Sequence, residues 1–148
     1  MATAIRTATA ADAERVAGLV SGLGYPTSSA QMCKRLASIL GDKDYATLVA
    51  CDGEHVVGLI GTRVGVLYES DGRYGQIMAL AVAPDHQRRG VGRMLVKAAE
   101  SMLVARGVDV LVVTSGNQRA DAHAFYEKCG YAFTGRRYKK SVTPSAEG

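Results

Sequence analysis

With 148 residues, of which 47% are hydrophobic and 22% charged, the chain has the length and composition of one globular domain with its own core. These proportions exclude an intrinsically disordered chain, and no apolar stretch approaches the roughly 20 residues that a membrane-spanning helix needs. The net charge of +4 suits an anionic ligand, but no run of Lys or Arg exceeds two residues, so nucleic-acid binding ranks last among the function classes.

The cysteines and histidines predict neither disulfide bonds nor a metal site. Cys33, Cys51 and Cys129 are odd in number, widely separated and without a CxxC pair, which favours free thiols in a reducing compartment. The three histidines lack the local spacing of metal ligands, and we expect His86 to face solvent. The N-terminal "MATAIRTATA" lacks the apolar segment of a secretory signal. We therefore expect a cytoplasmic protein without a bound metal or a membrane anchor.

Changes in hydrophobic period divide the chain into helices and strands. A short strand leads into two helices, and the β-rich middle of the chain has a hairpin at Asp52-Gly53. The run "YGQIMALAVAP" is apolar nearly throughout, as expected of a strand covered on both faces. The expected strands lie within 3–9, 46–68, 74–84 and 108–116, with one or two closing strands within 131–142. The expected helices cover 10–24, 28–40, 90–107 and 118–130.

This order, β-α-α-β-β-β-α-β-α-β-β, predicts an α/β fold with one mixed sheet. We expect a single domain over residues 1–142 and a frayed tail over 143–148, where the pattern is lost. The third helix is amphipathic, and the residues expected to face inward are Met94, Leu95, Ala98, Met102 and Leu103.

The most informative motif lies where a strand gives way to that third helix, in "APDHQRRGVGRMLVKAAE". A helix N-terminus offers unpaired backbone N–H groups and a partial positive charge. Gly90 and Gly92 let the backbone approach a ligand closely, and Gln87, Arg88 and Arg89 add donors around it. The pattern indicates a pyrophosphate site, with a tight turn carrying solvated arginines as the alternative. The third glycine of a dinucleotide fingerprint and the GK[ST] ending of a P-loop are both missing.

Two segments together resemble the GNAT superfamily of N-acetyltransferases. "LAVAPDHQRRGVGRMLV" resembles the family's acetyl-CoA-binding segment, Q/R-x-x-G-x-G/A after a strand ending in L-x-V-x-P. "TSGNQRADAHAFYEKCGYAFTGR" is similar to its N-x-x-A-x-x-F-Y-E-K-x-G-F/Y segment. With the opening of the chain, these segments cover most of the sequence in the family's order. Either motif alone is moderately specific, and the two at this separation are strong support for the resemblance.

The resemblance implies a GNAT-like mixed sheet whose central strands splay apart to admit the pantetheine arm of acetyl-CoA. The arm would pair with the backbone at Leu80, Ala81 and Val82. The pyrophosphate would lie on the backbone N–H groups of seven consecutive residues, which are Gln87, Arg88, Arg89, Gly90, Val91, Gly92 and Arg93. Asn117 aligns with a family residue that bonds pantetheine or caps the next helix.

Tyr126 aligns with the family tyrosine that commonly gives a proton to the coenzyme A sulfur. A phenol suits this role, because its ordinary pKa near 10 keeps it protonated at neutral pH. The alternative is an aromatic side chain that only packs the helix. The general base departs from the family pattern, since Gln76 stands where many relatives carry a Glu, and an amide accepts no proton at neutral pH. We assign no base from the sequence.

These features predict an acetyl-CoA-dependent N-acetyltransferase that moves an acetyl group to a primary amine by direct transfer in a ternary complex. A ping-pong route is disfavoured because no cysteine lies in a recognisable nucleophile setting. Two alternatives stay open: an acyltransferase that uses another acyl-CoA, and a non-catalytic acyl-CoA-binding sensor, which Gln76 keeps in view. The acceptor is expected to be a small-molecule or peptide amine of undetermined identity. A homodimer formed through edge strands or the C-terminal segment is a weaker expectation.

Overall fold

The computed structural model describes residues 3–114, 120–135 and 137–143. The chain divides into two compact units, Met1–Val113 and Thr114–Gly148, and each is described by itself. The first unit holds the whole sheet and three of the helices, and the second holds one helix. The expectation of a single domain over 1–142 stays a prediction.

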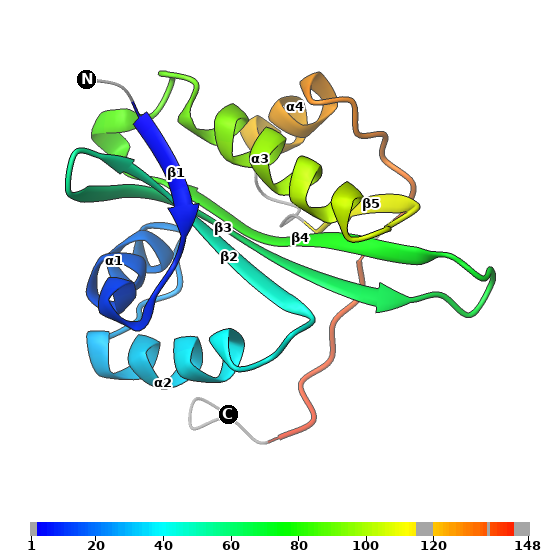
Figure 1. Cartoon of the computed structure of the whole chain (residues 1–148), viewed down its shortest axis with the longest axis horizontal. Coiled ribbons are helices and arrows are strands. Elements are labelled where there is room, and N and C mark those ends of the chain that lie inside the picture. The colour runs from blue at the N-terminus through cyan, green and yellow to red at the C-terminus, as the bar shows by residue number, and fades with distance from the viewer. Residues whose placement is uncertain (1–2, 115–119, 136, 144–148) are drawn as a thin grey trace. The chain divides into compact units, whose positions relative to one another are not determined.

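The first unit is built on a five-stranded sheet in the simple order β1-β2-β3-β4-β5 (Figure 1). The first four strands pair antiparallel, and β5 pairs parallel to β4, which makes the sheet mixed as predicted. The strands are β1 (Thr3–Thr7), β2 (Tyr45–Asp52), β3 (His55–Val66), β4 (Arg73–Val82) and β5 (Val110–Val113). The expected hairpin is confirmed, since Asp52 pairs with His55 across a turn that contains Gly53 at φ 62°.

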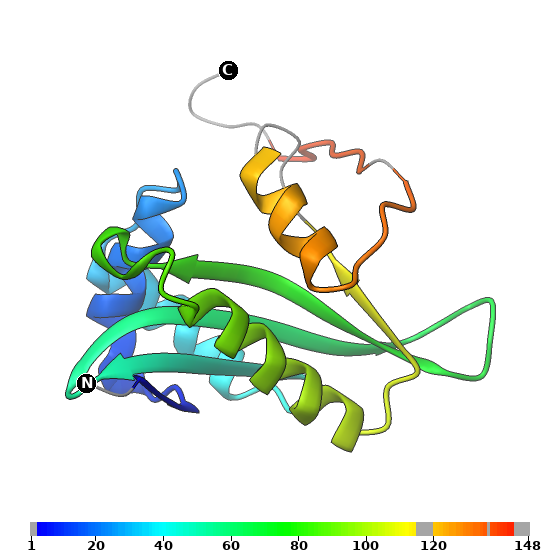
Figure 2. The ribbon, with the colours of Figure 1, turned by 90° about the horizontal axis from the view of Figure 1, so that it is seen from above.

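Helices cover both faces of this sheet. α1 (Ala13–Gly22) and α2 (Ser29–Leu40) lie on one face, and α3 (Val91–Ala105) crosses the other (Figure 1 and Figure 2). α2 begins at a reciprocal cap, in which the Ser28 N–H donates to Gln31 Oε1 at 2.9 Å and Ser28 Oγ accepts from the Gln31 N–H at 3.1 Å. The two helix layers therefore enclose the sheet between them.

The core consists of two layers, one on each face of the sheet. On the α1/α2 face, buried residues of both helices form one cluster with buried residues of the sheet: Val16, Met32, Leu36, Val49 and Leu59. On the other face, α3 buries Val91, Leu95, Val96, Ala99 and Leu103. A Cβ at Gly58 would lie 3.0 Å from Leu95 Cδ1, so this glycine lets the first turn of α3 lie close against β3.

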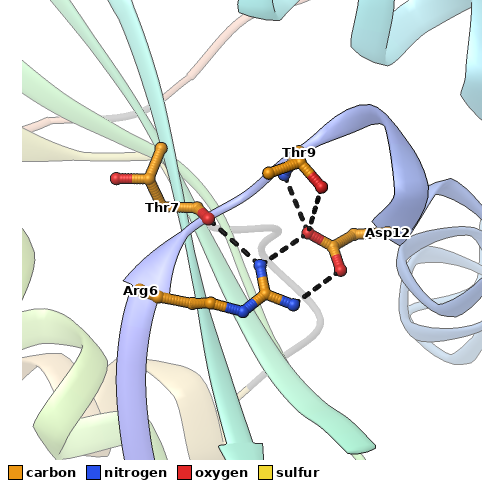
Figure 3. A network of polar contacts seen from close by, with 4 residues as sticks. All are labelled: Arg6, Thr7, Thr9 and Asp12. Carbon is orange, nitrogen blue, oxygen red and sulfur yellow. Dashed lines mark hydrogen bonds and ion pairs between the residues drawn. The ribbon is translucent and has the colours of Figure 1, made fainter. Parts of the chain in front are cut away.

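An ion pair fastens β1 to the start of the first helical segment (Figure 3). Arg6 Nη2 and Nη1 donate to Asp12 Oδ1 and Oδ2, each at 2.8 Å, and the Thr9 N–H donates to Oδ2 at 2.8 Å. Asp12 is buried, whereas the Arg6 side chain is 46% exposed. The Arg6 guanidinium, followed by the Thr9 N–H, holds the pKa of the Asp12 carboxyl below its usual value against the opposing effect of burial. Thr9 and Asp12 thus define the helix start, as their residue types suggest.

The predicted splay between the central strands is confirmed in the β4–β5 ladder. This parallel ladder joins Tyr74–Ile77 of β4 to Val110–Val113 of β5, and among the described residues none pairs with Met78–Val82 on that side of β4. The break coincides with a β-bulge, because Ile77 and Ala79 face consecutive residues of β3 and leave Met78 as the extra residue. The last pair of the ladder, Ile77 with Val113, is also the end of β5, and the bulge bends β4 and increases its twist at the same point.

The second unit contains α4 (Ala120–Lys128), which falls within the predicted final helix. The closing strands expected within 131–142 are wrong, because the described residues 131–135 and 137–143 belong to no strand. A strand needs a hydrogen-bonding neighbour, and the part of this unit that the structure describes offers only a helix. The residue types of "YAFTGRRYKKSV" favour strands, but they were not sufficient to predict one here.

The described helices are all too short or too polar to cross a membrane. Among the cysteines, Cys33 is exposed, Cys51 is buried and Cys129 is half-buried.

Candidate functional site

The free edge of β4 beyond the bulge is the first component of the candidate site. The Ala83 N–H donates to Val57 O at 2.8 Å, which fixes the direction of the alternating backbone groups along this antiparallel pair. The N–H and C=O groups of Ala81 therefore face β3, while those of Leu80 and Val82 face the side that β5 has left. Of the three residues predicted to pair with pantetheine, Leu80 and Val82 have the backbone direction that pairing requires.

The turn that follows β4 has an unusual backbone. A 3-10 helix, η2 (Pro84–His86), leads to Arg88 at φ 65° and Gly90 at φ 82°. Among the described residues outside glycine, Arg88 alone has a positive φ. Where residues of left-handed and right-handed helical backbone conformation alternate, their neighbouring N–H groups point into one concavity. Such concavities often bind anions. The two positive φ values thus support an anion site at this turn.

The N-terminus of α3 opens directly onto the same turn. Gly90 is its N-cap, no side chain caps the helix, and the first helical bond runs from the Met94 N–H to Gly90 O at 3.0 Å. The N–H groups of Val91, Gly92 and Arg93 consequently precede the first complete turn. A Cβ at Gly90 would meet nothing within 4 Å, so the space above this residue is open. The arrangement can accept a phosphate on its backbone donors.

Gln87 has a different role from the one its position suggests. Its side-chain amide donates to Val82 O at 3.1 Å, across the turn. This bond connects the turn to the end of β4. The carbonyl of Val82, which faces away from β3, is its acceptor. The exposed side chains of Arg88, Arg89 and Arg93 are the positive charges around the turn.

His86 is a second tether, and the expectation that it faces solvent is wrong. It is half-buried, with Nδ1 at 2.9 Å from Asp85 Oδ1 and Nε2 at 3.1 Å from Asp52 Oδ2 on the β2–β3 hairpin. The other Asp52 oxygen, Oδ1, is buried and has no hydrogen-bond partner among the described residues. Asp85, and then Asp52, raise the pKa of His86 above its ordinary value, while Arg89 opposes them. A protonated His86 therefore compensates two carboxylates at once and holds η2 against the hairpin.

This tether predicts a pH dependence. A raised folded-state pKa means that the stabilisation is complete below the ordinary histidine pKa of about 6.5 and is lost as the pH rises through the higher folded value. We expect the Tm difference between the wild type and His86→Asn to be largest at pH 6 and to shrink steadily toward pH 9 in thermal unfolding curves. His55→Asn, at an exposed hairpin position, is the control. A difference that grew with pH would contradict the tether.

In the second unit, the end of α4 fixes the ring of Tyr126. The Gly130 N–H donates to Glu127 O and the Tyr131 N–H donates to Tyr126 O, each at 3.0 Å, with Gly130 at φ 94°. These bonds are a Schellman motif, which brings the residue after the glycine against the residue five positions earlier. The Tyr131 ring accordingly lies 6.0 Å from that of Tyr126, and the Phe125 ring lies 5.3 Å from it, both edge-on.

The first unit thus brings together all the predicted coenzyme residues from Leu80 to Arg93. Tyr126 belongs to the second unit and is described there alone, and Asn117 lies outside the described residues. Sequence reasoning missed the His86–Asp52 tether and the ring partner Tyr131. For Tyr131 a signal existed, since glycine followed by an aromatic residue after a helix is typical of a Schellman motif.

A strand edge that leads into an uncapped helix N-terminus is the arrangement that the predicted donor site requires. Comparison with known families agrees, because a sequence model of the acetyltransferase (GNAT) family matches residues 8–131. The chain belongs to the GNAT acetyltransferase family, whose acyl donor is acetyl-CoA.

Relatives of known name are acetyltransferases. An aminoglycoside N(6')-acetyltransferase type 1 of Stenotrophomonas maltophilia is 32% identical over 96% of this chain and 95% of its own length. A [ribosomal protein bS18]-alanine N-acetyltransferase of Salmonella typhimurium is 39% identical over 47% of this chain, and a mycothiol acetyltransferase of Beutenbergia cavernae is 41% identical over 41%. The chain matches only 45% and 20% of the length of these last two proteins.

Solved structures share the fold over nearly the whole chain. A GNAT family acetyltransferase of Staphylococcus aureus superposes with a TM-score of 0.82 at 24% identity, covering 96% of this chain and 100% of that one. An aminoglycoside N-acetyltransferase in complex with CoA superposes with a TM-score of 0.84 at 16% identity, covering 96% of each chain. At these identities the likeness establishes the fold.

Proposed function

We propose that the protein is an acetyl-CoA-dependent N-acetyltransferase that transfers the acetyl group directly to a primary amine in a ternary complex. The observation that carries the proposal is the continuity between the free edge of β4 at Met78–Val82 and the uncapped N-terminus of α3. The names of the relatives, which act on amines of antibiotics and of a ribosomal protein, support N-acetylation as the reaction class. The acceptor is a small-molecule or peptide amine.

The proposed donor site uses backbone groups almost throughout. The pyrophosphate binds the N–H groups of the turn and of the first helical residues, from Arg88 to Arg93, with the three arginines supplying charge, whereas the Gln87 N–H already donates to Pro84 O at 3.4 Å. The pantetheine arm pairs with the outward-facing groups of Val82 and Leu80 and so runs toward the bulge at Met78. Backbone donors do not change rotamer, which preorganises the site for the donor.

The proposed chemistry is a direct attack of the neutral amine nitrogen on the thioester carbonyl carbon. A C–N bond forms, the C–S bond breaks, and the Tyr126 phenol gives its proton to the departing sulfur. The amine gives up a proton to water, because Gln76, at the comparable place for a base, is an amide. Water then returns a proton to the Tyr126 phenolate. Gln76 lies half-buried on β4 in register with Arg63, within the paired part of the strand.

The experiment that tests this function combines ligand binding with turnover. Acetyl-CoA at 100 times its Kd should stabilise the protein by about 2.7 kcal/mol, which raises Tm by several degrees, whereas ADP and NAD should not match this shift. Release of the coenzyme A thiol in the presence of an amine panel then measures transfer. Stabilisation without thiol release from any amine identifies a sensor, and faster release from propionyl-CoA than from acetyl-CoA identifies a different acyl donor. No stabilisation of folded protein removes the proposal.

Gly90→Ala tests the phosphate site with a matched control at the other end of the same helix. Gly90 and Gly107 both have left-handed backbones, at φ 82° and 86°, and both have open space where a Cβ would be. An alanine should cost about 1 kcal/mol of stability at either position. Gly90→Ala alone should also weaken acetyl-CoA binding by about tenfold, since its methyl group occupies the space where the phosphate approaches the backbone donors. Equal affinities in calorimetric titrations of the two variants would contradict this placement.

A further inference from the structure

On the face of the sheet opposite α3, β3 and β4 carry a polar cluster beside the fork between β4 and β5. The cluster consists of Arg63, Tyr74 and Gln76. Arg63 is the register partner of Gln76, and Tyr74 is that of Gly65, so all three side chains project from the same face. All three are half-buried. The apolar core of the α1/α2 face continues this surface toward the other end of β3.

The neighbouring strand leaves a space that the Tyr74 side chain fills. A Cβ at position 65 would lie only 2.5 Å from the Tyr74 ring, so the ring occupies the space that the absent side chain of Gly65 leaves. From there the phenol oxygen meets Arg63, whose Nη1 donates to Tyr74 Oη at 2.8 Å. A tyrosine oxygen that accepts this bond still has its own proton to donate. Arg63 and Tyr74 therefore present converging donors.

This cluster is positively charged. In the described part of the chain, Arg63 makes no ion pair with any carboxylate. Its only described hydrogen-bond partner is the neutral Tyr74, so the remaining guanidinium N–H groups are available. A guanidinium has five donors in a planar fork that matches a carboxylate, and partial burial strengthens such a bond. The cluster has the chemistry of a subsite for an anionic group.

The fork places this subsite next to the proposed reaction centre. If the pantetheine arm pairs with Val82 and Leu80, its thioester end lies toward Met78, about 13 Å along the strand from Val82 at 3.3 Å per residue. Gln76, the register partner of Arg63, is two residues further. On the opposite face Gly75 lies against Leu103 of α3, which covers β4 on that side at this point.

We propose that Arg63 and Tyr74 bind a carboxylate of the acceptor, which makes the preferred acceptor a primary amine of the amino-acid class rather than a polycation. This inference rests on the proposed function and names its substrate class. A carboxylate held by Arg63 brings the amino group of the same molecule to the fork beside Gln76. A polycationic amine meets the uncompensated charge of Arg63 instead, which repels it.

The test compares matched pairs of acceptors. Coenzyme A thiol release is measured at saturating acetyl-CoA with the twenty free amino acids, their carboxamides, and the polycations spermidine and kanamycin. We expect kcat/KM for the preferred free amino acid to exceed that of its carboxamide by at least tenfold, with the polycations lower still. Arg63→Gln should reduce this ratio to about one, and Arg63→Glu should invert it. Arg63→Lys should retain part of the preference.

Arg35→Gln is the matched control, because Arg35 is an exposed arginine that donates to the hydroxyl of Thr27 at 3.1 Å and lies on α2. It removes the same charge from the protein and should leave the acceptor ratio unchanged. The acetyl-CoA-induced Tm shift should be the same in every variant. Should the wild type turn over carboxamides or polycations as well as free amino acids, the carboxylate subsite is overturned while the acetyltransferase stands. Absence of both the Tm shift and thiol release overturns the proposed function, and the subsite with it.

Discussion

Replacement of Tyr126 by phenylalanine is expected to lower kcat by about 100-fold or more, the usual contribution of a general acid, while acetyl-CoA affinity stays within about twofold. The substitution removes the phenolic proton and keeps the ring. The edge-on contacts at 5.3 Å to Phe125 and 6.0 Å to Tyr131 are therefore retained, and so is the Schellman motif, which uses backbone groups alone. Steady-state thiol release with separate titration of acetyl-CoA provides both quantities.

Tyr131→Phe is the control for this prediction, because it removes a hydroxyl from the same aromatic cluster and keeps the ring that packs on Tyr126. Its kcat should stay within about threefold of the wild type. If Tyr126→Phe turned over at the wild-type rate, the tyrosine would be a packing residue and the proton would come from elsewhere. A loss of kcat accompanied by a large fall in Tm would likewise indicate packing rather than acid catalysis.

Breaking the Arg6–Asp12 ion pair should produce the largest loss of stability among single polar substitutions. Removing one partner of a fully buried pair costs about 3 to 5 kcal/mol, and the 46% exposure of Arg6 reduces our expectation to about 2 to 3 kcal/mol for Arg6→Gln. The remaining cost arises because Asp12 stays buried, with the N–H and the hydroxyl of Thr9 as its remaining described donors. Chemical denaturation at pH 7 measures the free energy of unfolding directly.

The same pair predicts the acid response of the protein. The folded-state pKa of Asp12 is lowered, so its stabilisation is complete above the ordinary carboxyl pKa of about 3.9 and is lost as the pH falls through the lower folded value. The free energy of unfolding should therefore fall less steeply between pH 5 and pH 2 in Asp12→Asn than in the wild type. Asp71→Asn, at an exposed turn position, should follow the wild-type slope. Parallel slopes for Asp12→Asn and the wild type would rule out this carboxylate as a contributor.

The fold was predictable where hydrophobic period and turn chemistry agree. The strand and helix order through α4 follows from such signals, including the Asp52-Gly53 hairpin. The face of α3 was predicted about one residue off, since Met94 is exposed while Val91 and Ala99 are buried. Helical spacing alone cannot distinguish neighbouring faces of an apolar helix, and the choice depends on close approach at Gly58, which only the paired sheet reveals.

The candidate site was predictable as a motif but not as a geometry. The glycines and arginines of the turn predicted a phosphate site, whereas the direction of the backbone groups, toward β3 at Ala81 and away from it at Leu80, depends on the register with β3. His86 was misjudged for the same reason. Its partner Asp52 lies far from it in sequence, because β3 and β4 separate the hairpin from the turn, and no local pattern predicts a contact between them.

The bulge consists of one extra residue, Met78, so a single codon determines whether β4 bends where its ladder with β5 ends. Without this residue, Ile77 and Ala79 would face consecutive residues of β3 as neighbours, and β4 would continue as a regular strand. A regular β4 would lack the bend that the bulge introduces just before the backbone groups of Leu80 and Val82 that face away from β3. One in-frame deletion would thus change the course of this strand edge, while the turn before α3 and its arginines keep their sequence. In a lineage of such proteins, the shape of the edge would therefore change through the loss of one residue, without a new fold.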